Sequence, residues 1–286
     1  NATPLSAYAM AVLAERAGVP AGVLNLVTGK TAEIGAELTS NPLVRKLTFT
    51  GSTAVGKQLM SECAGTVKRT SMELGGNAPF IVFDDADLDA AVAGAMASKY
   101  RNAGQTCVCA NRLLVQSGIY DAFAEKLAAA VSELKMGRGT DEDVQVGPLI
   151  DEQAADDVMA FIDDAVEKGA NVVAGGRRSD LGACYVEPTI LTRVSDDMRV
   201  FREEIFGPVA PLFRFDTEDE AIAMANDTEF GLACYFYARD IGRIWRVAEG
   251  LEYGIVGINE GIISNEMAPF GGVKESGQGR EGSKYG

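Results

Sequence analysis

Histidine is absent from the 286 residues of the sequence. Its absence excludes the Ser–His and Cys–His pairs of many hydrolases, together with zinc sites that depend on imidazole ligands. Any general base must therefore be an aspartate, a glutamate, a lysine, a tyrosine or a thiolate. An enzymatic interpretation of this chain is consequently restricted to a few kinds of catalytic group.

Cysteine is scarce, odd in number and without a CxxC pair. This pattern argues against a disulfide framework and for a reducing compartment, so we expect a cytoplasmic protein. Two cysteines one residue apart supply only half of a usual metal-ligand set, and no histidine can complete it, so we expect no metal site. The five cysteines are Cys63, Cys107, Cys109, Cys184 and Cys234.

Long apolar runs and net positive charge are also missing. No apolar run approaches the length of a transmembrane helix, although 47% of the residues are hydrophobic, which is enough for a sizeable globular core. The formal net charge is −15, so most exposed faces repel phosphate groups. We therefore expect neither nucleic acid nor a membrane as a partner, and a small anionic substrate would need locally placed positive groups.

The first part of the chain alternates helical and strand-like stretches. The spacing of apolar residues predicts helices over 5–18, 31–40 and 53–63, and strands over 23–27 and 44–49. Strands that alternate with helices indicate a parallel sheet, and therefore an α/β fold. The pattern starts with a helix that has no strand before it, so we expect that N-terminal sequence is missing.

The rest of the chain continues this alternation and ends differently. Apolar and capping residues predict a strand over 79–83 and a long helix over 87–102. Strands and turns dominate residues 185–215, whereas residues 254–286 are glycine-rich and irregular, as loops that line sites often are. We also expect helices over 119–135, 151–168, 217–226 and 240–250, and a short strand and turn over 171–176.

A glycine-rich turn follows the strand predicted over 44–49. Gly51 to Lys57 spells GxxxxGK, but a P-loop needs Ser or Thr after the lysine to hold magnesium, and that residue is Gln58. An acidic strand end at Asp84 imitates the magnesium partner of such a loop. The turn can instead present N–H groups and the Ser52 hydroxyl to a dinucleotide pyrophosphate, or it can be a plain strand–helix turn with an N-cap.

Two positions in the sequence combine a nucleophile or a base with a glycine-containing turn. Cys107 follows a Gly-Gln-Thr turn after a helix, where reactive side chains are commonly exposed, and nearby Arg101 or Lys99 could lower its pKa. Glu73 ends a strand-like run before two glycines, and in a histidine-free chain such a carboxylate can activate water. The structural alternatives are a buried, inert thiol and a solvated strand-end glutamate.

A pair of carboxylates, Glu203 and Glu204, precedes an apolar turn. Paired carboxylates can perform acid–base chemistry. The alternative is one solvated glutamate and one that accepts a hydrogen bond from a hydroxyl or an amide. We favour a hydroxyl partner such as a ribose.

Taken together, these motifs resemble the aldehyde dehydrogenase superfamily. The matching segments are FTGSTAVG, MELGGNAPFIVFDDADLD, NAGQTC, REEIFGPV and PFGGVKESGQGREGSKYG, which keep the order of the family and span nearly the whole chain. The resemblance implies part of a Rossmann-like NAD(P)-binding domain over 1–75 and an α/β catalytic domain over 76–275. Residues 276–286 would begin a tail that returns toward the cofactor and oligomerisation region of a homodimer or homotetramer.

The resemblance also assigns roles to individual residues. Cys107 would attack the aldehyde to give a thiohemiacetal, transfer of hydride to NAD or NADP would leave a thioester, and Glu73 would activate the water that releases the acid. The backbone N–H of Cys107 and an upstream Asn side chain would stabilise the oxyanion. The cofactor would contact Gly51 and Ser52 through its pyrophosphate, Leu74 near the nicotinamide, Glu204 through a ribose, and Phe206 nearby.

Within the superfamily, KYRNAGQTCVCANR and GREGSKYG look most like succinate-semialdehyde dehydrogenase. In that subfamily an Arg and a Ser bind the distal carboxylate of the substrate, and the matching residues are Arg101 and Ser264. An anionic aldehyde needs a placed guanidinium on so acidic a protein, although Arg101 could equally be a helix C-terminal charge. Glutarate semialdehyde is a close alternative substrate, and Cys109 is a candidate partner of Cys107 in a redox-regulatory disulfide.

Family members have about 180 further residues upstream, as expected for a complete dinucleotide fold with extensions. That part would hold the oxyanion Asn, a Lys that meets the adenosine ribose and a second substrate Arg, while an oligomerising strand would follow residue 286. We therefore expect the isolated chain to be weakly active or inactive. A nucleotide-triphosphate hydrolase and a non-enzymatic binding remnant are the competing interpretations.

Overall fold

The structure is a computed structural model that describes residues 3–285, divided into two compact units. The first unit comprises residues 3–47 and 57–70, and the second comprises 48–56 and 71–285. The predicted α/β class is confirmed. The predicted domain boundary at residue 75 stays a prediction. Within residues 3–285 no helix has both the length and the apolar character needed to cross a membrane.

The first unit contains the helices α1 (Leu5–Arg16) and α2 (Thr31–Ser40), close to the predicted bounds. The strand predicted over 23–27 is wrong, because these residues lie in turns and irregular backbone. Their valines and leucines are exposed, and no neighbouring strand supplies the ladder of hydrogen bonds that would make them a strand. Local composition alone therefore misled the prediction here.

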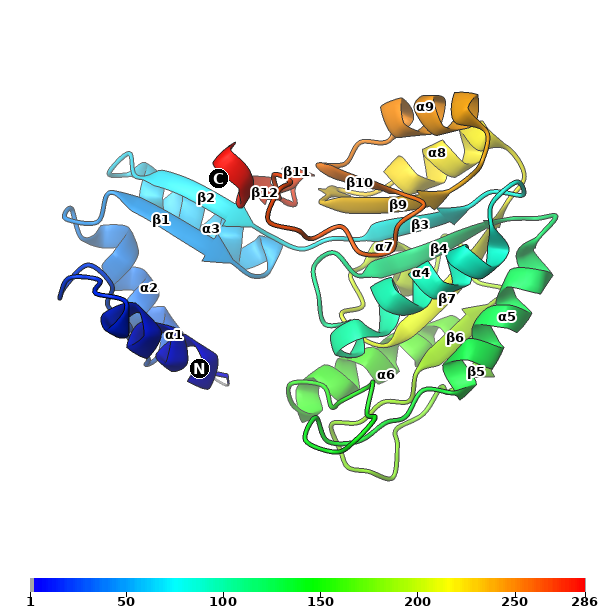
Figure 1. Cartoon of the computed structure of the whole chain (residues 1–286), viewed down its shortest axis with the longest axis horizontal. Helices are drawn as coiled ribbons and strands as arrows, with labels where there is room; N and C mark the ends of the chain where they lie inside the picture. Colours follow the sequence, from blue (N-terminus) through cyan, green and yellow to red (C-terminus); the bar gives the residue numbers. More distant parts are fainter. Residues whose placement is uncertain (1–2, 286) are drawn as a thin grey trace. The chain divides into compact units, whose positions relative to one another are not determined.

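The second unit is built on a seven-stranded sheet of order β10-β9-β3-β4-β7-β6-β5 (Figure 1). All neighbouring strands pair in parallel except β5 and β6. The strands are β3 (Ala78–Val82), β4 (Ala110–Gln116), β5 (Asn171–Ala174), β6 (Thr189–Thr192), β7 (Val209–Phe215), β9 (Ala233–Tyr237) and β10 (Ile255–Ile258). The central strands are almost wholly buried, as expected for a parallel sheet covered on both faces.

Helices connect these strands and cover the sheet. Helices α4 and α5 lie against each other and against β4, whereas α8 contacts α9 and β3. The chain runs from β3 to β4 and onward to β7 in one direction and then returns to β9, so right-handed crossovers place these two helix pairs on opposite faces. The helices are α4 (Leu88–Tyr100), α5 (Tyr120–Ser132), α6 (Glu152–Glu167), α7 (Arg199–Arg202), α8 (Glu218–Asn226) and α9 (Ile241–Gly250).

Side-chain caps explain why four of these helices begin where they do. Asp87, Asp151, Thr217 and Asp240 each accept a hydrogen bond from the backbone N–H three residues later. Such caps satisfy N–H groups that have no partner inside the helix. The predicted helices over 87–102, 151–168, 217–226 and 240–250 are therefore confirmed, each within about two residues at either end.

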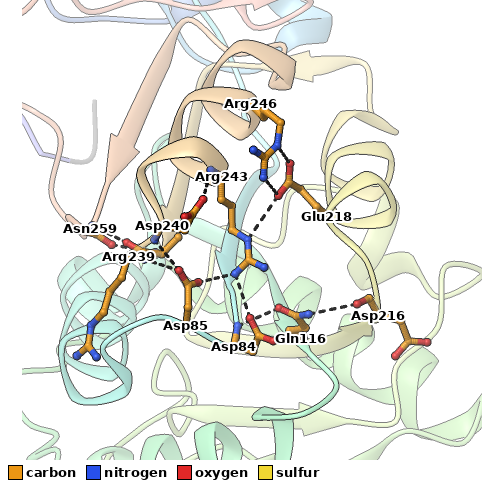
Figure 2. A network of polar contacts seen from close by, with 11 residues as sticks. Asp84, Asp85, Gln116, Asp216, Glu218, Arg239, Asp240, Arg243, Arg246 and Asn259 are labelled. Atoms are coloured by element: carbon orange, nitrogen blue, oxygen red, sulfur yellow. Dashed lines mark hydrogen bonds and ion pairs between the residues drawn. The ribbon is translucent and has the colours of Figure 1, made fainter.

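A network of charged side chains fastens α9 to the end of β3 (Figure 2). Arg243 of α9 pairs with Asp84 at 3.0 Å and with Asp85 at 2.5 Å, and its guanidinium stacks over the Phe83 ring. Asp85 also accepts hydrogen bonds from the backbone N–H groups of Arg239 and Asp240. Both carboxylates thus bind Arg243, and Asp85 also binds backbone, so the resemblance of Asp84 to a magnesium ligand has a structural origin.

The remaining strands are short and gather near residues 71–76. A three-stranded sheet has the order β1-β2-β12, in which β12 (Gly277–Gln278) places Gly277 opposite Glu73. The segment 254–285, predicted to be irregular, contains the short strands β10, β11 and β12. Pairing with strands that are distant in the sequence decides their structure. The other elements are β1 (Lys46–Thr50), α3 (Thr53–Ala64), β2 (Arg69–Glu73), β8 (Phe230–Gly231), β11 (Val273–Lys274), η1 (Arg101–Gly104) and η2 (Ser283–Tyr285).

Candidate active site

Three loops that enter adjacent strands of the large sheet form the candidate site. Gly75 and Gly76 precede β3, Cys107 precedes β4, and Glu204 precedes β7. Because β3, β4 and β7 are neighbours and run in parallel, their entering loops meet at one edge of the sheet. Gly75 and Glu204, which are 129 positions apart in the sequence (204 minus 75), are thereby brought together.

These loops surround a cavity of about 570 Å³ inside the second unit. The volume lies in the usual range for small-molecule and cofactor sites. Seven of the ten predicted site residues line it, together with four that were not singled out: Thr50, Gly75, Gln105 and Thr106. The predicted residues that line the cavity are Gly51, Ser52, Glu73, Leu74, Cys107, Glu204 and Phe206.

The turn that carries Cys107 is held in an unusual backbone conformation. Asn102 and Ala103 have positive φ angles of 52° and 53°, and Gly104 follows at 76°. A Cβ on residue 104 would lie 2.2 Å from the carbonyl oxygen of Gly207, so only glycine allows this approach. Left-handed non-glycine residues cost about 1–3 kcal/mol each and cluster at functional sites.

Hydrogen bonds fix both sides of this turn. The Gln105 side chain accepts a hydrogen bond from the backbone N–H of Ile150 at 2.9 Å and donates to the carbonyl of Asn102 at 3.0 Å. On the other side, the Tyr235 hydroxyl donates to the carbonyl oxygen of Val108 at 2.6 Å. Gln105 therefore holds the loop that carries Cys107 in place. Its position next to Thr106 and Cys107 in the sequence could have indicated this role.

The Cys107 thiol is partly buried, and burial is the main cause that raises its pKa to about 11. The carboxylates of Glu204 and Glu73 raise this pKa further, whereas the backbone N–H groups of Cys107 and Val108 oppose the shift. A thiol at neutral pH is thus the resting form on this chain. Positive charge brought near the sulfur would favour the nucleophilic thiolate.

The Glu73 side chain is 3% exposed, which is why its carboxyl resists ionisation. Burial raises the pKa of Glu73 to about 7, and the charge of Glu281 adds to the shift, while Arg280 opposes it. A carboxylate with a pKa near the working pH is suited to general-base catalysis. The structural alternative of a solvated glutamate is therefore wrong.

The paired glutamates separate into two environments. Glu203 is exposed and pairs with Arg199 at 2.8 Å, whereas the carboxylate of Glu204 accepts a hydrogen bond from the N–H of Gly76 at 3.1 Å. Burial raises the pKa of Glu204 to about 7, and the Gly76 N–H and Lys99 counteract the shift. Within this chain, Glu203 is thus the solvated glutamate, and Glu204 is the one that accepts a hydrogen bond from an amide.

Unpartnered buried polar atoms accumulate around the nucleophile. Across residues 3–285, three buried side-chain atoms lack a hydrogen-bond partner: Oε2 of Glu73, Oγ1 of Thr106 and Nζ of Lys99. Glu73 and Thr106 line the cavity, and the charge of Lys99 acts on Glu204. Leaving such groups unsatisfied costs about 1–3 kcal/mol each, which a purely structural core would avoid.

The lining of the cavity could hold part of a dinucleotide. Leu74 and Phe206 supply apolar walls, Glu204 supplies acceptor oxygens, and a Cβ on residue 75 would lie 2.7 Å from Oε2 of Glu204 and fill this cradle. The N–H of Gly51 donates to the carbonyl of Glu73 at 3.0 Å and is not available to a phosphate. Ser52 is exposed at the start of α3, where a helix N-terminus favours anions.

Three predicted residues lie outside the lining of the cavity. Arg101 is exposed at the end of α4, and its charge only partly opposes the burial that raises the pKa of Cys109 and the pKa of Tyr235. Ser264 is exposed in an irregular segment. Cys109 is a buried free thiol whose Sγ lies 3.4 Å from the carbonyl oxygen of Ala110. The roles of these three residues stay predictions.

Comparison with known protein families gives a match over residues 1–286. The chain belongs to the aldehyde dehydrogenase family. Among curated members of this aldehyde dehydrogenase family, the chain is 67% identical over 284 residues to the NADP-dependent succinate-semialdehyde dehydrogenase of Escherichia coli K12. It is 66% identical to a glutarate-semialdehyde dehydrogenase of Pseudomonas aeruginosa and to a 3-sulfolactaldehyde dehydrogenase of Pseudomonas putida.

Solved aldehyde dehydrogenases have the same fold over the shared length. The succinate-semialdehyde dehydrogenase from Burkholderia pseudomallei superposes with a TM-score of 0.98 at 67% identity, covering 99% of this chain and 59% of that one. The alignments with the three curated relatives likewise cover 99% of this chain and 58–59% of each relative. It thus spans about three fifths of the length of the relatives it matches.

Proposed function

We propose that the protein carrying this chain oxidises an anionic aldehyde to a carboxylic acid with NAD or NADP, through a covalent bond to Cys107. The observation that carries this proposal is the cavity that joins the Cys107 thiol to two buried carboxyl groups, those of Glu73 and Glu204. Membership of the aldehyde dehydrogenase family supports the same chemistry. The preferred substrate in this proposal is succinate semialdehyde, which would yield succinate.

The steps on the chain itself begin with Cys107. After the thiol has lost its proton to solvent, its Sγ adds to the aldehyde carbon and gives the oxyanion of a thiohemiacetal. Loss of a hydride from that carbon, as the oxyanion re-forms the C=O bond, leaves a neutral thioester. When bound, the nicotinamide supplies the acceptor for this hydride. The Glu73 carboxylate then removes a proton from a water molecule whose oxygen adds to the thioester carbon, and the acid departs as Cys107 regains its sulfur lone pair and proton.

Glu204 and Gly75 would hold the cofactor rather than react. The second oxygen of the Glu204 carboxylate faces the space that glycine at residue 75 leaves open, where a ribose hydroxyl can approach. Related proteins include both an NADP-dependent succinate-semialdehyde dehydrogenase and a betaine aldehyde dehydrogenase in complex with NAD+. Each aldehyde is therefore assayed once with NAD and once with NADP.

Relatives of nearly equal identity act on three different anionic aldehydes according to their descriptions. Succinate and glutarate semialdehydes differ by one methylene, which is worth only about 1–3 kcal/mol of discrimination. Arg101 and Ser264 are the residues that we propose to bind the distal anionic group, because a guanidinium binds carboxylate or sulfonate oxygens through several N–H donors.

The test is a kinetic comparison on the natural, full-length protein. We expect the highest kcat/KM for succinate semialdehyde, a lower value for glutarate semialdehyde and 3-sulfolactaldehyde, and none after Cys107→Ala. Arg101→Ala should lower kcat/KM for the anionic aldehydes about 100-fold while sparing neutral butanal, since a charge-assisted pair is worth about 1.5–3 kcal/mol. Arg138→Ala, which removes an exposed arginine that does not line the cavity, is the matched control.

Two outcomes would contradict the proposal. Undiminished aldehyde oxidation by the Cys107→Ala variant would remove the covalent route. Equal losses for butanal and for the anionic aldehydes after Arg101→Ala would show that Arg101 does not recognise the anionic group.

A further inference from the structure

Two buried amides lie between the central strands, and neither has a role in the chemistry described above. Asn77 directly precedes β3 and is 1% exposed, and Asn111 belongs to β4 and is 3% exposed. The Nδ2 of Asn111 donates to Oδ1 of Asn77 at 2.7 Å. The Nδ2 of Asn77 in turn donates to the carbonyl of Phe201 at 2.9 Å.

Asn111 binds the backbone on both sides of Glu204. Its Nδ2 donates to the carbonyl oxygen of Glu203 at 2.9 Å, and its Oδ1 accepts from the N–H of Ile205 at 3.1 Å. These two groups belong to the peptide units before and after the Glu204 Cα atom. One side chain therefore fixes both peptide planes from which the Glu204 carboxylate projects.

The carboxylate end of Glu204 is fixed by the same region of the chain. Its Oε1 accepts from the N–H of Gly76, which is the residue before Asn77. The loops entering β3 and β7 are thus connected twice, once through Gly76 and once through the two asparagines. Glu204 is held at its backbone and at its carboxylate, whereas its neighbour Glu203 is an exposed residue paired with Arg199.

Only a primary amide can make this set of contacts. Asparagine offers two N–H donors and an acceptor oxygen in one plane, aspartate has no donor when ionised, and leucine has neither. Burying two amides is unfavourable unless all of their hydrogen bonds form, so an apolar pair would suffice if core stability were the sole requirement. Residue 111 must donate to the Glu203 carbonyl and accept from the Ile205 N–H at the same time, which explains why an asparagine is found there.

We propose that Asn111 is a positioning residue that sets the place of the Glu204 carboxylate and thereby the affinity for the dinucleotide. This inference rests on the proposed function, in which Glu204 binds a cofactor ribose. It adds a residue to the site that touches no cofactor and acts only through the backbone of another residue.

The test compares Asn111→Asp with a matched control in the natural, full-length protein. Asn226 donates to the carbonyl of Gly250 at 2.8 Å and accepts from the N–H of Glu252 at 3.0 Å. Its amide thus binds the backbone on both sides of residue 251, as Asn111 does around residue 204. We expect Asn111→Asp to raise the Kd for NAD(P) about tenfold, with kcat at saturating cofactor within about twofold. Both variants should lower Tm to a similar extent, but Asn226→Asp should leave the Kd for NAD(P) unchanged.

A double-mutant cycle identifies the route of the effect. If Asn111 acts through Glu204, the tenfold effect of Asn111→Asp should fall below twofold in a Glu204→Ala background. An unchanged Kd in Asn111→Asp, or effects that multiply fully with Glu204→Ala, would overturn the inference. Asn111→Ser, which introduces no buried charge, replaces Asn111→Asp if that variant does not fold.

Failure of the proposed function would look different. If Glu204→Ala alone leaves the Kd for NAD(P) unchanged, Glu204 does not bind the cofactor, and the ribose assignment is wrong. Hydrogen exchange of residues 201–207 without cofactor then still tests the positioning. Faster exchange in Asn111→Asp but not in Asn226→Asp supports it, and equal exchange in both variants refutes it.

Discussion

Gly76 and Cys107 approach each other so closely that a Cβ on residue 76 would lie 2.4 Å from the carbonyl oxygen of Cys107. Gly76 does not have the positive φ that commonly explains a glycine, so its lack of a side chain serves the close approach. The same residue donates its N–H to Glu204. The loop before β3 thus sets the distance between the nucleophile and the carboxylate beside it.

Replacing Gly76 by alanine should therefore displace the nucleophile loop. We expect Gly76→Ala to lower kcat/KM about 100-fold, because a misplacement of about 1 Å can have that effect, and to destabilise the fold by about 1–3 kcal/mol. Steady-state kinetics and denaturant unfolding measure the two effects. Gly139→Ala is the control, since a Cβ at residue 139 meets nothing within 4 Å, and equal behaviour of both variants would contradict the prediction.

Glu73 should make the stability of the fold depend on pH. Its folded-state pKa of about 7 lies above the ordinary value of 4.5, so the folded state holds the proton more tightly. Its stabilising contribution is full below about pH 4.5 and is lost as the pH rises through 7. Glu73→Gln should therefore be more stable than the parent by about 1–3 kcal/mol at pH 8, with little difference at pH 4.5.

Unfolding in urea at the two pH values tests this expectation, and Glu133→Gln at the end of α5 is the control for loss of an exposed carboxylate. An equal effect of Glu73→Gln at both pH values would show that the carboxyl ionises normally in the fold. If Glu73 is the base that we propose, the same variant should retain the first turnover and lose the hydrolysis step.

The reactivity of Cys107 without cofactor should increase far into the alkaline range. Burial and two carboxylates raise its pKa to about 11, so the rate of alkylation by iodoacetamide should still be rising between pH 8 and pH 10. Glu204→Gln removes one of the two charges and should accelerate alkylation at pH 8 several-fold. A plateau reached by pH 7 in the parent protein would disprove the prediction, and Cys107→Ala identifies the labelled residue.

Cys109 is the proposed redox partner of Cys107. Peroxide would convert the Cys107 thiol to a sulfenic acid, and attack by the Cys109 sulfur would release water and form a disulfide that dithiols can reverse. Because Cys109 is buried and its pKa is raised, mainly by desolvation, we expect this step to be slow. In Cys109→Ala, excess peroxide should oxidise the unprotected sulfenic acid further to a sulfinic acid, which dithiothreitol does not reduce, and full recovery with dithiothreitol in that variant would exclude protection by the disulfide.

The sequence predicted the parts of the fold that depend on local patterns. Helix starts at Asp87 and Asp240 could be identified because a capping side chain and the first helical turn are neighbours in the sequence. The family motifs likewise located Glu73, Cys107 and Glu204, since each lies in a short segment of distinctive composition. All three residues line one cavity.

Features that depend on distant partners could not be predicted in this way. Val23 and its neighbours have strand-forming side chains but no paired strand, whereas Ile255–Ile258 are surrounded by glycines and still form β10 beside β9. Asn111 is an unremarkable polar residue in the sequence, and its importance follows only from atoms near residue 204. The sequence shows the two glycines before Asn77. It does not show that the carbonyl oxygen of Cys107 lies where a side chain at residue 76 would be.

The position of the site at the entering edge of β3, β4 and β7 has a consequence for how it comes into being. Its groups belong to segments that no local structure can bring together, so the cavity exists only after these three strands have paired. Pairings between distant parts of a chain form slowly, because the entropy of closing long loops is lost before any contact compensates for it. Recovery of a reactive, carboxylate-flanked thiol during refolding is therefore a late event that reports completion of the central sheet.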